Sequence, residues 1–397
     1  MDFTFSEEQK ILFSEFEKLC REKIEPNAEV LDRNGNKDSE GKVIRENFKI
    51  LADFGYLGAF FPSELGGSSL DFVTYFTMAE YLAKACASTY LSSMAHTLLC
   101  ANFIYMFGSN EQKRKYIPKL SKGEFLGALC ATEPSGGSDL AALKTKAEKK
   151  TGKFVIWGNK SFVTNGTIAD IFIVLARIPL ENKTKRYDGI TAFILERDDK
   201  GLSVGQPYDK LGARGSPTCD VFLEGVEVSP ERVLGSEGQG FQECMKVFDI
   251  GRIGMAIYSL GIISACLDEC KKYANERYAF GKRISSYEDV NFKIVDMQVA
   301  LDTGRVILQK CAYLQDNKAE NIGAISSIAK LFISEKATKL SSDAVQIFGG
   351  TGYIRGTKVE RLYRDAKLGE IGEGTSEIQR RVIFRNLMKE FGLSPYR

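Results

Sequence analysis

A glutamate between two glycines is the residue in this sequence with the clearest potential for acid–base chemistry. Glu373 stands between Gly372 and Gly374, and Thr375 and Ser376 follow directly. Glycine on both sides removes side-chain bulk, so backbone and substrate can approach the carboxylate closely. A carboxylate in dry surroundings can act as a general base, whereas an exposed one here would only complement the dipole of a following helix. We take Glu373 as the candidate catalytic base.

Two helical patterns predict how this glutamate is positioned. Ile378, Val382 and Leu387 recur with helical spacing, which predicts a helix that begins just after Glu373. Residues 253–273 are apolar on most faces, which is typical of a helix buried within a bundle or at a subunit interface.

The chain as a whole has three zones of different texture. Helical patterns run from a predicted N-cap at Ser6 to about residue 120. Short β-branched and aromatic runs between turn residues then predict an antiparallel sheet or small barrel at 121–234. Helical patterns return at 235–397. This order predicts a multidomain, mainly α protein with domains 1–120, 121–234 and 235–397, and it is not the alternation of a doubly wound fold.

The composition excludes several classes of function. A net charge of +2 on 397 residues gives no overall attraction to nucleic acid or to an anionic membrane. Nine cysteines without dense spacing predict reduced thiols, and a single histidine, His96, argues against a zinc site and a histidine-based triad. No stretch approaches 18 uninterrupted apolar residues, so we expect no membrane insertion. The start of the chain has no targeting pattern, so we expect a cytoplasmic protein.

Glycine-rich segments do not predict a classical nucleotide fold. The segment 235–240 follows a proline-containing loop, and the segment 349–352 has no strand before it. A dinucleotide fingerprint needs a strand before it and a helix after it. We therefore expect any nucleotide cofactor to bind by another mechanism.

Seven motifs occur in order along the chain. They are Ala131–Asp139 (ATEPSGGSD), Lys160–Gly166 (KSFVTNG), Lys210–Thr218 (KLGARGSPT), Phe248–Arg252 (FDIGR), Glu276–Gly281 (ERYAFG), Gln346–Gly350 (QIFGG) and Glu373–Glu377 (EGTSE). In this order they resemble the acyl-CoA dehydrogenase family, and most closely its short-chain, butyryl-CoA branch, over essentially the whole chain. The resemblance implies a helical N-terminal domain, a central β-barrel and a C-terminal four-helix bundle, assembled as a homotetramer that binds FAD.

The resemblance also implies a reaction. The family desaturates acyl-CoA thioesters between the α- and β-carbons, and here the acyl group would be short, branched or cyclic. Glu373 would remove the α-proton, and flavin N5 would take the hydride from the β-carbon. The amide of Glu373 and a ribityl hydroxyl of FAD would stabilise the thioester oxygen. Electron-transferring flavoprotein would accept the electrons.

Site residues follow from the matched motifs. Contacts to FAD are implied for Leu129, Cys130, Ala131, Thr132, Gly137, Ser138, Phe162, Val163, Thr164, Arg277, Phe280, Glu288, Gln346, Ile347, Phe348, Gly349, Gly350, Thr375, Ser376 and Glu377. Contacts to the substrate are implied for Tyr90, Met94, Ser138, Asp249, Ile250, Gly251, Arg252, Gly372 and Gly374. Arg277 would reach the FAD pyrophosphate of a neighbouring subunit, for which a bidentate guanidinium is suited. Asp249 and Arg252 would hold the pantetheine arm.

Five positions depart from the family pattern. Gly372 replaces an aromatic residue, commonly tyrosine, which opens space beside Glu373 for a bulkier or ring-shaped acyl group. Tyr90 stands where the short-chain branch has glycine, so the acyl pocket is reshaped. Phe162 replaces tryptophan, and Glu288 replaces a glutamine that contacts FAD. Gly251 stands where some branches carry an alternative catalytic glutamate. The segment 86–97 has no Lys or Arg, which argues against a dicarboxylate substrate.

Three alternatives stay open. An acyl or aminoacyl group tethered to a carrier protein ends in the same pantetheine arm, and a basic rim for the adenosine phosphate would favour CoA. A direct reaction with oxygen would make the enzyme an oxidase. A non-catalytic relative that binds DNA would need a strongly basic surface, which the near-neutral charge does not predict.

Overall fold

The N-terminal third of the protein is helical. The computed structural model describes residues 4–37, 41–180, 184–319 and 322–393. The N-terminal helices are α1 (Glu7–Leu19), α2 (Asn27–Asn34), α3 (Lys42–Asp53), α4 (Phe72–Ala85), α5 (Ala87–Met94), α6 (Asn102–Phe107) and α7 (Asn110–Ser121), with a π-helical segment at Ala95–Ala101 between α5 and α6. The predicted N-cap is confirmed, because the Ser6 hydroxyl accepts a hydrogen bond from the Gln9 amide and Gln9 bonds back to Ser6.

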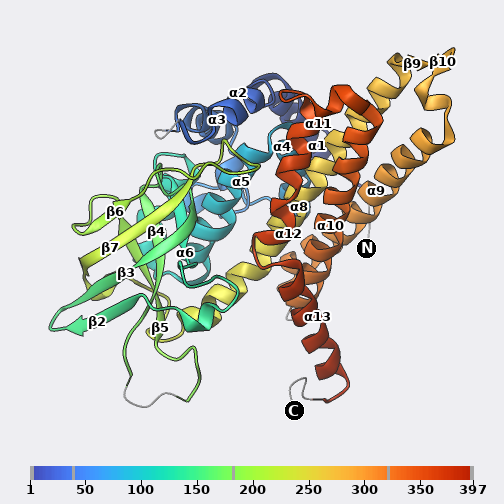
Figure 1. Cartoon of the computed structure of the whole chain (residues 1–397). Helices are drawn as coiled ribbons and strands as arrows, with labels where there is room; N and C mark the ends of the chain where they lie inside the picture. The colour runs from blue at the N-terminus through green and yellow to red at the C-terminus, as the bar shows by residue number, and fades with distance from the viewer. Residues whose placement is uncertain (1–3, 38–40, 181–183, 320–321, 394–397) are drawn as a thin grey trace.

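A sheet follows, drawn in green on the left of Figure 1. Its strands are β1 (Gly127–Cys130), β2 (Lys146–Lys150), β3 (Lys153–Thr164), β4 (Ile171–Arg177), β5 (Ile190–Glu196), β6 (Leu202–Val204), β7 (Thr218–Val228) and β8 (Val233–Leu234). They pair in the order β6-β7-β3-β2-β4-β5-β8, and β1 pairs with β4 in parallel. Most pairs are antiparallel, as predicted.

Strand β4 is buried on both faces, which explains its uninterrupted apolar sequence. Ile173 and Leu175 pack into the large helical core, whereas Phe172 and Val174 point into the separate core of the sheet. Successive side chains of a strand alternate between faces, so β4 joins the two cores.

Long helices form the C-terminal part, drawn from yellow to red in Figure 1. They are α8 (Gly240–Glu276), α9 (Glu288–Asp316), α10 (Ile322–Phe348), α11 (Lys358–Ala366), α12 (Leu368–Ile371) and α13 (Ser376–Glu390), and a small hairpin of β9 (Tyr278–Ala279) and β10 (Lys282–Arg283) lies between α8 and α9. Helix α8 is long and apolar enough to cross a membrane, but its most apolar window is wholly buried within the protein. This helix is the buried core helix that the sequence predicts.

The single histidine joins the N-terminal helices to the sheet. His96 is fully buried, and its Nδ1 accepts a hydrogen bond from the Gly127 amide at 3.0 Å. Nε2 therefore carries the proton and donates a hydrogen bond to the Leu120 carbonyl at 3.0 Å. Burial lowers the pKa of His96 to about 4, so the ring stays neutral. Its role is to position β1 against α7.

A partly buried charge network joins all three zones. Arg364 on α11 makes a bidentate ion pair with Asp32 on α2, at 2.7 and 2.8 Å. Arg214, from the loop before β7, donates to the Asp32 carbonyl at 3.0 Å. Asp365, next to Arg364, accepts a hydrogen bond from the Ala213 amide at 2.6 Å. Helix α11, which leads directly to α12 and Glu373, is therefore tied to both other zones. We name this set the three-zone clasp.

Candidate active site

Glu373 lies in a left-handed turn between α12 and α13. Gly372 ends α12 with an extended backbone, and Glu373 and Gly374 then adopt φ values of 54° and 88°. A left-handed backbone suits Gly374, but it costs energy for a glutamate, so the surrounding structure must hold it. Thr375 caps α13 by accepting a hydrogen bond from the Ile378 amide.

Two buried side chains hold the carbonyl groups of this turn. The Gln379 amide donates to the Glu373 carbonyl at 3.1 Å and to the Gly374 carbonyl at 2.8 Å. The Lys330 ammonium, from α10, donates to the same Gly374 carbonyl at 2.7 Å. Both side chains are 0% exposed. With both carbonyls held from the protein side, the conformation of the turn is fixed.

The carboxylate of Glu373 has one oxygen out of contact with solvent, although the residue as a whole is half-buried. Its Oε2 atom is buried and has no hydrogen-bond partner among the described residues. A Cβ atom on Gly251 of α8 would lie 2.5 Å from this Oε2 and 2.8 Å from Leu99, so only glycine leaves room there. Burial raises the pKa of Glu373 from 4.5 to about 7, although the charges of Arg252 and Lys330 act in the opposite direction. A carboxyl group with a pKa near neutrality is matched to general-base catalysis.

The predicted pantetheine residues lie on α8 beside the base. Asp249 and Arg252 form an ion pair at 2.5 Å. Arg252 is buried, and its Nε has no partner among the described residues. Burial raises the pKa of Asp249 although Arg252 lowers it. Ile250 is buried and Gly251 faces the base, so the predicted segment does converge on Glu373.

A second buried ion pair orders the loop that follows β1. Lys160 of β3 contacts Glu133 at 2.9 Å, and both side chains are buried. The Glu133 carboxylate also accepts hydrogen bonds from the backbone amides of Lys144 and Thr145, at 2.6 and 2.9 Å. The loop with the predicted contacts Ala131, Thr132, Gly137 and Ser138 is thereby fixed to the sheet.

An exposed aromatic ring lies next to this loop. The Ser161 amide of β3 donates to the Thr132 carbonyl at 2.9 Å, which brings the two predicted segments together. Phe162 has φ 57° and is 68% exposed. Val163 is buried and the side chain of Thr164 is half-buried. An exposed ring beside the half-buried Thr132 and Thr164 forms a surface on which a planar ring system could stack.

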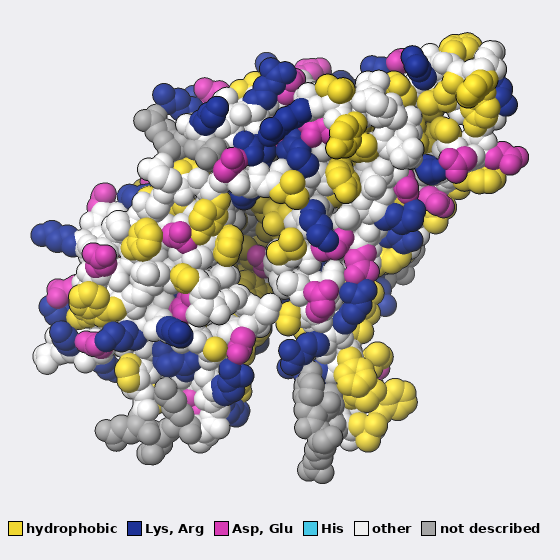
Figure 2. Space-filling view, in the orientation of Figure 1, with side chains coloured by type: hydrophobic (Ala, Val, Ile, Leu, Met, Phe, Trp, Pro, Cys, Tyr) yellow, Lys and Arg dark blue, Asp and Glu magenta, His cyan; other side chains and the backbone are white. Residues whose placement is uncertain are grey.

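Ser138 lines a basic cleft between the sheet and the C-terminal helices. The cleft has a volume of about 430 Å³. It is lined by Ser138, Asp139, Arg186, Phe241, Ile378, Arg381, Val382 and Arg385. Figure 2 shows the hollow between these two parts of the protein, with dark blue basic side chains beside it. Three arginines against one aspartate make this cleft positively charged.

The predicted floor of the acyl pocket is tightly packed. The Tyr90 hydroxyl donates to the Gly254 carbonyl of α8 at 2.9 Å, and the side chain is 0% exposed. A Cβ atom on Gly254 would lie 2.8 Å from Met94, so Met94 packs directly against the α8 backbone. Met255 packs against Gly372 in the same way, because a Cβ atom on Gly372 would lie 2.9 Å from the Met255 side chain. The space that the missing aromatic side chain leaves at Gly372 is thus partly taken by Met255.

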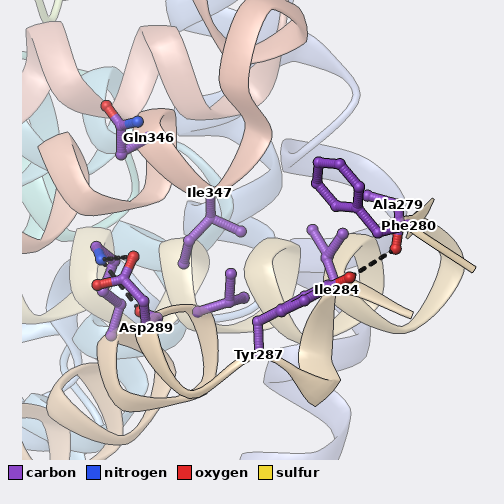
Figure 3. A pocket seen from close by; sticks show the side chains of 9 residues that line it. Ala279, Phe280, Ile284, Tyr287, Asp289, Gln346 and Ile347 are labelled. Carbon is purple, nitrogen blue, oxygen red and sulfur yellow. Dashed lines mark hydrogen bonds and ion pairs between the residues drawn. The ribbon is translucent and has the colours of Figure 1, made fainter. Parts of the chain in front are cut away.

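A second group of predicted FAD residues lies elsewhere in the same chain. Phe280, Gln346 and Ile347 line a cleft of about 270 Å³ formed with the start of α9 (Figure 3). Phe280 is 97% exposed, and Arg277 and Glu288 are exposed at the ends of α8 and α9. Figure 1 shows the hairpin at the far end of the helices from the sheet. A single chain therefore does not bring the two groups of residues together.

The remaining predicted residues divide between the two groups. Leu129 and Cys130 belong to β1, and Ser376 and Glu377 begin α13 beside the base. The Ser376 hydroxyl is buried without a partner among the described residues. Phe348 ends α10 and stacks on Tyr273, with Gly349 and Gly350 directly after it. These last residues lie with the hairpin cleft.

Sequence reasoning missed the residues that hold and surround Glu373. Gln379 and Lys330 were not candidates, and neither were Leu99 and Gly254. Lys330 did carry a signal, because it is the only charged residue between 322 and 334. A lone lysine in an otherwise apolar helix has a cost that a specific contact must offset.

Comparisons with known proteins agree with this geometry. Three family models match in order: the acyl-CoA dehydrogenase N-terminal domain at residues 6–124, the middle domain at 128–226 and the C-terminal domain at 238–388. The chain is 38% identical to a short-chain-specific acyl-CoA dehydrogenase of Clostridium acetobutylicum, over 96% of this chain and 98% of that protein.

Two solved structures share the fold. The structure of butyryl-CoA dehydrogenase from Megasphaera elsdenii has a TM-score of 0.90 and 35% identity, and covers 98% of this chain and 100% of its own. The prolyl acyl carrier protein oxidase AnaB also has a TM-score of 0.90, with 31% identity over 97% of this chain and 100% of its own. The predicted fold class and family are confirmed. The chain belongs to the acyl-CoA dehydrogenase family, whose members are FAD-dependent oxidoreductases.

Proposed function

We propose that the protein desaturates a short-chain, branched or cyclic acyl-CoA thioester between its α- and β-carbons, with Glu373 as the base. The observation that carries the proposal is the buried Oε2 of Glu373, which has no partner among the described residues. With a pKa of about 7, the carboxylate is ionised in a useful fraction at neutral pH and is basic enough to accept a proton from the α-carbon. The thioester makes that proton more acidic.

The turn that holds the base also offers an amide to the substrate. The carbonyl groups of Glu373 and Gly374 are bonded to Gln379, and Lys330 also binds the Gly374 carbonyl. We propose that the Glu373 amide donates to the thioester oxygen, where negative charge develops as the α-proton leaves. Because both carbonyls are already held, this donor is preorganised.

The residues present fit FAD. The exposed ring of Phe162 offers a stacking surface, and the half-buried Thr132 and Thr164 lie in the two adjoining segments. The buried, unpartnered Ser376 hydroxyl at the start of α13 is a further polar group for a ligand. When bound, FAD would supply the hydride acceptor for the β-carbon. We propose that these residues hold the flavin, with Thr132, Ser138, Thr164 and Ser376 as its polar contacts.

The other half of the cofactor site would come from a second subunit. Phe280, Gln346 and Ile347 line a separate cleft, with Arg277 exposed beside it. Apolar side chains are also exposed on α9, among them Phe292, Val295 and Val299, which is unfavourable for a surface that stays in water. We propose that the protein is a homotetramer in which the hairpin of one subunit covers the FAD of another.

The basic cleft favours CoA over a carrier protein. Arg186, Arg381 and Arg385 line the same cleft as Ser138, and α13 carries two of them. Guanidinium groups bind phosphates bidentately, as the nucleotide end of CoA requires. A carrier protein presents one phosphodiester at this place, whereas CoA adds further phosphates, which Arg381 and Arg385 could bind beside the Arg186–Asp139 ion pair. We propose electron-transferring flavoprotein as the electron acceptor.

An anaerobic titration tests the proposal. The purified protein should have a flavin spectrum, and butyryl-CoA or a cyclic acyl-CoA should bleach it. The Glu373→Gln variant should keep the spectrum and resist bleaching. Bleaching by an acyl carrier protein, and not by any acyl-CoA, would indicate that the substrate is tethered to a carrier protein. A colourless protein that did not take up added FAD would refute the enzyme proposal.

A further inference from the structure

Lys330 is a buried lysine that the proposed reaction does not yet use. Its side chain is 0% exposed, and it extends from the middle of α10 to the turn that holds Glu373. The ammonium group donates to the Gly374 carbonyl at 2.7 Å. No ion pair within 4.0 Å is formed by this ammonium with any described carboxylate. Burying a lysine in this way is costly, because its charge leaves water.

The hydrogen bond alone does not explain this cost. The Gln379 amide already donates to the same Gly374 carbonyl at 2.8 Å without a charge. A neutral side chain on α10 could supply a second donor. The positive charge itself therefore needs an explanation.

Charged groups on four elements face this ammonium. Glu373 lies in the turn, Glu370 on α12, Glu377 on α13 and Arg252 on α8. Burial lowers the pKa of Lys330 to about 8, while the three glutamates act in the opposite direction. Lys330 is thus mostly protonated at pH 7. The charges of Arg252 and Lys330 in turn lower the pKa of Glu373, against the effect of burial. The Cys244 thiol on α8 is a further titratable group that faces Glu373.

We propose that Lys330 is a positioning residue for the catalytic base: its ammonium group holds the Gly374 carbonyl of the left-handed turn, and its charge favours the ionised form of Glu373. The inference rests on the proposed role of Glu373 as the base. Burial disfavours the ionised carboxylate, which is the form that accepts the proton. Lys330 supplies a fixed counter-charge that does not occupy the carboxylate oxygen needed for the α-proton.

Three variants separate the charge from the hydrogen bond. Lys330→Met removes both and keeps an unbranched apolar side chain. Lys330→Arg keeps the charge. Gln379→Leu removes the neutral donor to the same carbonyl and leaves the charge in place, so it is the matched control for a loosened turn. Should Lys330→Met fail to fold, the comparison of Lys330→Gln with Lys330→Arg makes the same distinction.

The first measurement is kcat against pH with the best acyl thioester. In Lys330→Met the rising limb should move up by about one pH unit, which adds a loss of about fivefold at pH 7 to the pH-independent loss from the loosened turn, and only the fivefold part should be recovered at pH 9. Lys330→Arg should restore the limb to near its original pH. Gln379→Leu should lower kcat at every pH and leave the limb in place. A limb that stays in place in Lys330→Met would overturn the proposal.

The second measurement does not depend on activity. Infrared difference spectra between each protein and its Glu373→Gln derivative report the protonated carboxyl group of Glu373 as the pH is raised. The midpoint of this titration should be higher in Lys330→Met than in the parent, and unchanged in Gln379→Leu. If no thioester is desaturated, the proposed function fails while this titration still tests Lys330. Equal midpoints in the parent and Lys330→Met would refute its role.

Discussion

Replacing the candidate base by glutamine should stabilise the protein above neutral pH while it abolishes activity. The pKa of Glu373 is raised from 4.5 to about 7 by burial. Between these two values the folded protein binds more protons than the unfolded chain, so the wild type loses stability as the pH rises. The difference between 4.5 and about 7 amounts to about 3 kcal/mol. Glu373→Gln has no such group and should keep this stability at pH 8.

Thermal unfolding of both proteins between pH 4.5 and pH 8 checks this expectation. The two melting temperatures should be closest at pH 4.5, where the carboxyl group is protonated in the folded wild type and about half protonated in the unfolded chain. The difference between the two melting temperatures should grow through the interval and become constant above pH 7, where the variant should melt about 5 °C higher than the wild type.

The neighbouring carboxylate provides a control of opposite sign. Burial would raise the pKa of Glu370 on α12, but hydrogen bonds and the charges of Lys367 and Lys330 lower it overall. Its ionised form is stabilised by folding, so Glu370→Gln should lose stability relative to the wild type as the pH rises. Melting curves of wild type and Glu373→Gln that run parallel across the interval would show that Glu373 is not held in a dry site.

Three further predictions follow from the packing around the site. Gly251→Ala would place a Cβ atom 2.5 Å from the Glu373 carboxylate and 2.8 Å from Leu99, so kcat should fall at least about tenfold in steady-state kinetics, and the overpacking should lower the melting temperature in thermal unfolding. Met94→Ala should open the floor against Gly254 and move the preferred acyl chain to greater length, measured by kcat/KM across a series of acyl-CoA thioesters; an unchanged preference would place the pocket elsewhere. Arg364→Met would leave a carboxylate buried without its partner in the three-zone clasp, and unfolding measurements should show a loss on the order of 3 kcal/mol.

The zones of the fold could be predicted because their patterns are local. The capping box at Ser6 and the strand run at 171–176 use residues close in sequence, and the structure has both elements. The long apolar pattern from residue 253 is equally local, and it predicts the burial of α8 correctly. The order of strands in the sheet could not be predicted, because β3 pairs with β7 over more than 50 residues and no local pattern records that pairing.

The site could be predicted in part. Glu373 was selected as a candidate from its two glycines, and the glycine at 251 was named without its physical reason, which is the carboxylate packed against it. The holding residues could not be found by spacing, because Lys330 and Gln379 reach the turn from two different helices. The dryness of the carboxylate is likewise a property of packing, and sequence alone does not give it.

The three-zone clasp has a consequence for how this protein can be recombined with its relatives. The loop at Ala213 and Arg214 meets Asp32 from one zone and Asp365 from another, and a Cβ atom on the adjoining Gly212 would lie 2.3 Å from the α11 backbone. A chimaera cut at the zone boundaries would therefore separate side chains from the backbone they were fitted to. Exchanges that carry the 210–218 loop together with α2 and α11 keep that joint intact. Segments that contact one another across the zone boundaries must therefore be exchanged together, just as the residues within one zone must.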